Sequence, residues 1–99
     1  MPMPIPSQSS GRKTSDTQIS TDTCYLTGVI VECDGTNAAT VEIYDGTSSS
    51  GTLVFRHIYL GANTKTDPVF INVPIICNGG MFLDLTGTGA AATVLYVKA

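Results

Sequence analysis

The sequence contains no tryptophan and only one histidine, and charged residues make up 13% of its 99 positions. No apolar run approaches the roughly 18 residues that a membrane-spanning helix needs. A basic face is also missing, since the net charge is −3 and residues 23–99 carry only Arg56, Lys65 and Lys98, which are scattered. These absences argue against a membrane span and against a nucleic-acid-binding face.

Cysteine is scarce, and the number of cysteines is odd. The odd count of three, Cys24, Cys33 and Cys77, argues against the disulfide framework of a secreted protein. On one extended strand Cys24 and Cys33 would lie about 30 Å apart, whereas a disulfide needs Cα atoms within roughly 7 Å. We expect three reduced, packing cysteines. Because the N-terminal residues lack a basic-then-apolar signal pattern, we expect assembly in a cytoplasm.

Catalytic and cofactor-binding patterns are also lacking. His57 is expected in mid-strand between Arg56 and Ile58, and no G-x-S-x-G nucleophile elbow occurs. One histidine without any C-x-x-C pair cannot complete a zinc site. We therefore expect no enzyme, with no catalytic residue, metal, cofactor or small-molecule substrate, and His57 as a hydrogen-bonded structural residue.

Two weaker binding alternatives stay open. Asp34, Asn37 and Asp45 can gather around a calcium ion, although such residues are ordinary in hairpin loops. The tyrosines can form a sugar-stacking platform, although packing along strands explains them equally well. They are Tyr25, Tyr44, Tyr59 and Tyr96.

What the sequence does contain is a series of short β-branched segments separated by Gly-rich turns. Gly28 predicts a bulge or a close approach, and Pro74 predicts an edge strand or a bulge, because proline lacks a ladder donor. The pattern predicts an all-β, antiparallel β-sandwich, jelly-roll-like or Greek-key, of six to eight short strands with essentially no helix. The expected strands are Cys24–Cys33, Ala39–Tyr44, Thr52–Leu60, Val69–Cys77, Met81–Leu85 and Thr93–Lys98, with residues 17–23 as a possible seventh.

Residues 1–22 have no apolar periodicity and are expected to form an extended N-terminal arm, which leaves 23–99 as the sandwich domain. Alternating prolines favour a polyproline-like track that loses little entropy on docking, while the residues between them can fill apolar pockets. Two basic residues follow as a clip. The expected arm contacts are Pro2, Met3, Pro4, Ile5, Pro6, Arg12 and Lys13.

Two expected strands are apolar on both faces, although a two-layer sandwich buries only one face of each strand. In residues 24–33, Tyr25, Val29 and Val31 would oppose Leu26 and Ile30. If several such side chains stayed exposed to solvent, several kcal/mol of hydrophobic stabilisation would be lost, so we expect self-association. The face proposed for the subunit contact in residues 52–60 carries Val54, Arg56, Ile58 and Leu60.

From about Tyr25 onward the chain resembles the small Thr/Gly-rich β-sandwich proteins encoded among the head and tail genes of tailed bacteriophages. The resemblance rests on YLTGVIVECDGTNAATVEIYDGTSSSGTLVF and on the closing NGGMFLDLTGTGAAATVLYVK. It implies a non-enzymatic virion component that is often oligomeric.

We accordingly expect a capsid decoration (cement) protein on the outer surface of the virion head, favoured as a homotrimer. Its N-terminal arm would dock on the major capsid protein and stabilise the shell. The alternatives are a neck, tail or fibre component and a carbohydrate-binding adhesin domain.

Overall fold

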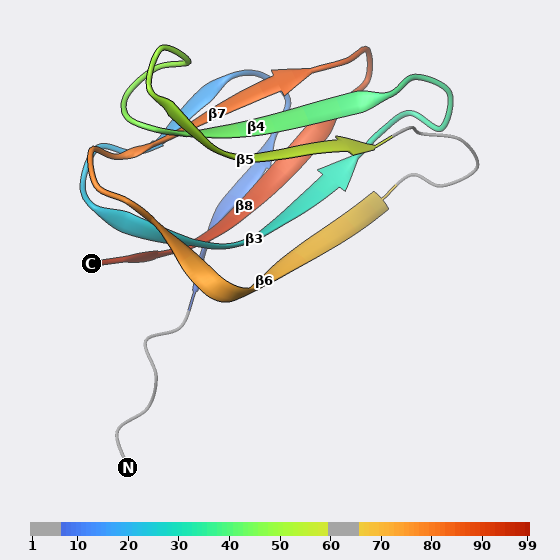
Figure 1. The fold of residues 1–99 in the computed structure, drawn as a ribbon. Coiled ribbons are helices and arrows are strands. Elements are labelled where there is room, and N and C mark those ends of the chain that lie inside the picture. Colours follow the sequence, from blue (N-terminus) through green and yellow to red (C-terminus); the bar gives the residue numbers. More distant parts are fainter. Residues whose placement is uncertain (1–6, 60–65) are drawn as a thin grey trace.

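The computed structural model describes residues 7–59 and 66–99, and in them all regular structure is β-strand. Eight strands form two four-stranded antiparallel sheets that pack face to face (Figure 1). The predicted all-β antiparallel sandwich is confirmed. The strands are β1 (Gln8–Lys13), β2 (Thr17–Ser20), β3 (Cys24–Glu32), β4 (Ala39–Asp45), β5 (Thr52–Tyr59), β6 (Thr66–Cys77), β7 (Met81–Thr86) and β8 (Ala91–Lys98).

The strand order is that of a jelly roll. Sheet A has the order β1-β8-β3-β6, and sheet B has the order β2-β7-β4-β5. The first four strands therefore pair with the last four in reverse: β1 with β8, β2 with β7, β3 with β6, and β4 with β5. Such a ribbon of paired strands, wrapped into two sheets, is the double Greek-key arrangement of jelly rolls.

The core lies between the two sheets and follows the alternation of the central strands. A bulge in β3 between Leu26 and Gly28 shifts that alternation by one residue. Leu26 and Val29 are consequently both fully buried, and Tyr25 and Ile30 are only partly buried. The expected grouping of Tyr25 with Val29 on one face is wrong for this reason. The largest fully buried side chains are Leu26, Ile43, Met81, Leu83, Val29, Val31, Val41, Val94, Cys24 and Cys77.

Residues 8–20 do not form a free arm; β1 and β2 are the edge strands at one side of the two sheets (Figure 1). The possible seventh strand at 17–23 corresponds to β2. Both strands are mostly polar, and side-chain hydrogen bonds help to hold them: Ser10 Oγ accepts from the Val94 amide at 2.9 Å, and Gln18 Nε2 donates to the Met81 carbonyl at 3.1 Å. Because an edge strand of this kind needs no apolar stripe, the sequence pattern did not reveal it. The sandwich begins with β1 at Gln8, and the domain boundary expected after residue 22 is wrong.

Candidate functional site: an apolar docking surface

The edge strand β6 departs from regular pairing at its centre. Leu26 of β3 lies opposite Ile75, but Gly28, two residues further on, lies opposite Phe70. Residues 71–74 therefore bulge away from β3. Pro74 lies in this bulge, as its missing amide donor predicted.

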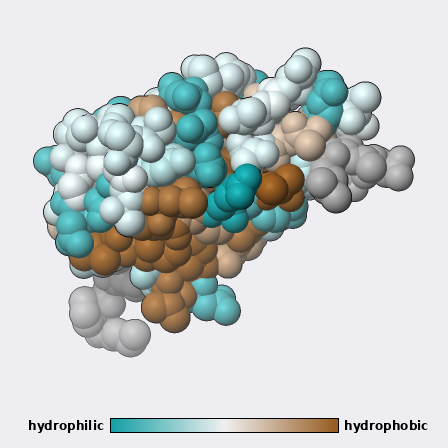
Figure 2. All heavy atoms as spheres, turned by 45° about the horizontal axis from the view of Figure 1, so that its top comes forward, coloured by the Kyte–Doolittle hydropathy of each residue, from teal (hydrophilic) through white to brown (hydrophobic). Residues whose placement is uncertain are grey.

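Large apolar side chains are exposed along β6. The exposed fractions are 68% for Phe70, 77% for Val73 and 42% for Ile76. Figure 2 shows hydrophobic atoms gathered along the side of the molecule where β5 and β6 form the sheet edges. The outer surface of sheet B, above that side, is mostly neutral to hydrophilic in the same view. Apolar strips of this kind are unusual on small monomers and are typical of contact surfaces.

A hollow on the outer face of sheet A continues this strip. It has a volume of about 320 Å³ and is lined by Tyr25, Pro74 and Val97. Tyr25 lies opposite Ile76 on one side and Val97 on the other, so three neighbouring strands contribute to one apolar row. We define the apolar docking surface as this hollow together with Phe70, Val73 and Ile76.

Gly28 shapes the next row of the same face. It lies opposite Phe70 and Leu95, and a Cβ at this position would be 3.3 Å from Cδ1 of each. The two side chains therefore converge over the bare glycine backbone. The close approach predicted at Gly28 is present, and so is the bulge beside it.

The face predicted for the subunit contact is divided by a bulge between Ile43 and Tyr44 in the β4–β5 pairing. Val54 packs against the core, whereas Arg56 and Ile58 are exposed, Ile58 by 47%. The Arg56 guanidinium lies 3.5 Å from a Glu42 carboxylate oxygen. Leu60 lies outside the described residues.

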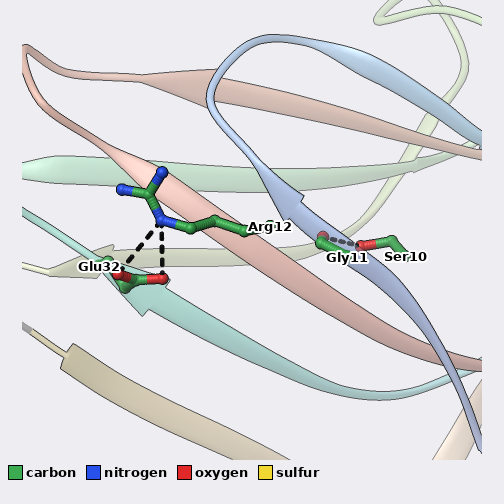
Figure 3. A network of polar contacts seen from close by, with 4 residues as sticks. All are labelled: Ser10, Gly11, Arg12 and Glu32. Carbon is green, nitrogen blue, oxygen red and sulfur yellow. Dashed lines mark hydrogen bonds and ion pairs between the residues drawn. The ribbon is translucent and has the colours of Figure 1, made fainter.

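The residues predicted as arm contacts fall into two groups. Arg12 and Lys13 belong to β1, where Arg12 Nε lies 3.3 Å from Glu32 Oε1 of β3, on the far side of β8 (Figure 3). Arg12 thus has a partner within the chain. The predicted contacts Pro2, Met3, Pro4, Ile5 and Pro6 lie outside the described residues.

His57 joins the two sheets at the side of the sandwich. Its Nε2 lies 2.6 Å from Asp67 Oδ2, so β5 of sheet B is tied to β6 of sheet A. This is the hydrogen-bonded structural position expected from the sequence.

The loop acids expected in turns accept backbone hydrogen bonds there. Asp34 Oδ1 accepts from the amides of Thr36 and Asn37 at 2.8 and 2.7 Å, which holds the Asp34 pKa below its usual value. Asp45 Oδ1 accepts from the Gly79 amide at 2.7 Å. Within residues 7–59 and 66–99 no group of three or more His, Cys, Asp or Glu side chains is placed to hold a metal ion.

The four tyrosines do not share one face. Tyr25 lines the hollow on sheet A, and Tyr44 Oη lies 3.2 Å from Glu42 Oε1 on sheet B. Tyr59 and Tyr96 pack against the core. A stacking platform made from all four is therefore absent.

Sequence reasoning missed the contribution of β6. Its segment VFINVPIIC is apolar at neighbouring positions as well as alternate ones. The same pattern of two apolar faces predicted a contact surface on β3 and β5, and it also identifies β6. The described part of the chain holds no helix that is suited to crossing a membrane. Comparisons with protein-family models, with curated proteins and with solved structures gave no match.

Proposed function

We propose that this protein is a non-enzymatic structural component that decorates a phage capsid and docks on it through the apolar surface of β6. The observation that carries the proposal is the exposure of Phe70, Val73 and Ile76 on one edge strand beside an apolar hollow. Burying what remains exposed of these three side chains would contribute on the order of 3–5 kcal/mol. That gain is large for a chain of this size and is realised only on a partner surface.

Ser7, the first residue that the structure describes, lies on the same face. Ser7 Oγ lies 2.8 Å from Thr27 Oγ1, two residues from Tyr25 of the hollow. Ser7 therefore lies beside the apolar docking surface, and we propose that Met3 and Ile5 contact the same partner. We propose residues 1–6, in place of residues 1–22, as the capsid-binding arm.

The choice of a capsid as partner rests on the resemblance to phage head and tail proteins, and the jelly roll is a fold that viral capsid proteins use. The use of jelly rolls in capsid proteins is an analogy between folds, and it carries less weight than an argument from a specific site. Binding to the assembled shell, and not to free capsid protein, would stabilise the shell by mass action at every occupied site. A homotrimer on a local symmetry axis is the proposed arrangement.

The test is binding to purified empty phage heads by a double variant, Phe70→Asp with Val73→Asp. Both side chains are exposed, so the fold should persist, whereas two buried carboxylates would weaken docking by about 100-fold or more. The matched control is Ser49→Asp, which adds a charge in the exposed β4–β5 loop. Co-sedimentation measures the affinity, and calorimetry of the heads measures the shell stabilisation.

Equal binding by the double variant and the wild-type protein would contradict the docking surface. Binding confined to a small ring at one vertex would instead favour a neck, tail or fibre role, which counting copies per particle distinguishes. A glycan that competes with head binding would favour the adhesin alternative.

A further inference from the structure

Two of the three cysteines are brought together by the β3–β6 pairing. Cys24, the first residue of β3, lies directly opposite Cys77, the last residue of β6. Both side chains are fully buried, and both sulfurs are free thiols. We propose that Cys24 and Cys77 are an oxidisable pair whose disulfide staples the edge strand β6 to β3.

The geometry of the pair suits the bond. Directly opposed residues of antiparallel strands have Cα atoms about 4.5–5.5 Å apart and side chains on the same face. A disulfide spans Cα separations of roughly 4.4–6.8 Å, so little backbone movement is needed. Cys33 lies just beyond the other end of β3 and has no such relation to Cys77.

The chemistry balances with a disulfide oxidant such as oxidised glutathione. One cysteine thiolate attacks glutathione disulfide, forms a mixed disulfide and releases one glutathione thiolate. The second cysteine thiolate then attacks the protein sulfur of the mixed disulfide and displaces the other glutathione. The protein loses two protons and two electrons, and the two electrons reduce the oxidant to two glutathione thiols.

Burial makes this reaction slow in the closed protein. Desolvation raises the pKa of Cys77 to about 12, and it also raises the pKa of Cys24, against a hydrogen bond from Ser20 that lowers it. Thiolate therefore forms mainly when the end of β6 opens beside the Asn78–Gly80 turn. Edge-strand ends are the parts of a sheet that open most readily.

The staple would act on the strand that carries the apolar docking surface, although the inference does not depend on what that surface binds. It would join residues far apart in sequence and so restrict the unfolded chain strongly. We expect oxidation to raise the melting temperature by roughly 10 °C and to slow amide exchange at Leu26 and Ile75.

The test incubates the full-length protein with oxidised glutathione at pH 8, alkylates the remaining thiols under denaturing conditions and measures the intact mass. The expected product carries one alkyl group in place of three. Digestion with trypsin and a Glu-specific protease cuts after Glu32 and so separates Cys24 from Cys33. The peptide containing Cys24 should be linked to the peptide containing Cys77.

Cys33→Ala is the matched control and should form the same disulfide, with no thiol left to alkylate. Three alkylated thiols after prolonged oxidation, a link that includes Cys33, or a link between two chains would each overturn the proposal. A disulfide that forms between Cys24 and Cys77 but leaves the melting temperature unchanged would overturn the stapling role. Reduction with dithiothreitol should restore the original melting temperature.

Discussion

At the scale of single residues, the outer face of sheet B carries a row of three charged side chains, two acidic and one basic. Asp84 of β7 lies directly opposite Glu42 of β4, and Glu42 lies opposite Arg56 of β5. Desolvation raises the Asp84 pKa, and the carboxylates of Asp16 and Glu42 raise it further. Like charges directly opposite one another destabilise a sheet, and the ion pair of Arg56 is with Glu42.

A folded-state pKa above the unfolded value means that the folded protein holds the Asp84 proton more tightly. The contribution of Asp84 to stability is therefore complete below the ordinary aspartate pKa of 3.8 and is lost as pH rises through the folded pKa. Asp84→Asn should stabilise the protein at pH 7 by roughly 0.5 kcal/mol, and the gain should vanish near pH 3. Urea unfolding at both pH values measures this. Asp22→Asn, at an exposed turn, is the control, and a gain that persists at pH 3 would exclude the proposed cause.

At the scale of strands, the central elements could be predicted and the edges could not. Residues such as Val41 and Ile43 in β4, or Met81 and Leu83 in β7, alternate strictly with more polar neighbours, and the structure buries them. Apolar periodicity cannot predict β1, because this strand is held by main-chain pairing and by hydroxyls such as Ser10 Oγ. Bulges cause the remaining errors, because one inserted residue moves the following side chains to the other face.

The same limit explains the candidate site. The apolar docking surface depends on the bulge in β6, whose position follows from its register with β3. Pro74 indicated an irregular strand, but no local signal in the sequence identifies Val73 as its most exposed large side chain.

His57 of edge strand β5 contacts Asp67 of edge strand β6. His57→Ala should lower the free energy of unfolding by about 1 kcal/mol, because it removes a hydrogen bond to a carboxylate that joins the two sheets. Arg56→Ala is the matched neighbour, since its exposed ion pair with Glu42 lies within sheet B and contributes less. Denaturant unfolding gives the stabilities, and hydrogen exchange should rise in β5 and β6 only for His57→Ala. Equal effects of the two substitutions would contradict this role.

At the scale of the whole molecule, β1 and β2 complete the two sheets on the side opposite β5 and β6. They cover the outer edges of β8 and β7, and Ile19 of β2 packs against the core. The sandwich therefore includes residues 8–20, in contrast to the sequence-based boundary.

Two truncations distinguish these boundaries. Deletion of residues 1–6 should leave the melting temperature within a few degrees of the full chain, because the sheets keep all their strands. Deletion of residues 1–21 should cost several kcal/mol and expose the edges of β7 and β8, with aggregation as the visible result. Circular dichroism and calorimetry measure both. A stable, monomeric protein lacking residues 1–21 would show that β1 and β2 are dispensable.

The reversed pairing of the strands also sets the order in which the protein can fold during synthesis. The two strands of the β4–β5 hairpin are synthesised one after the other and can pair early, whereas Gln8 of β1 can pair with Tyr96 of β8 only when the chain is almost complete. During translation β1, β2 and β3 therefore leave the ribosome long before their partners exist, with Leu26 and Val29 uncovered. Six charged residues in and beside these strands are gatekeepers against association in that interval: Arg12, Lys13, Asp16, Asp22, Glu32 and Asp34.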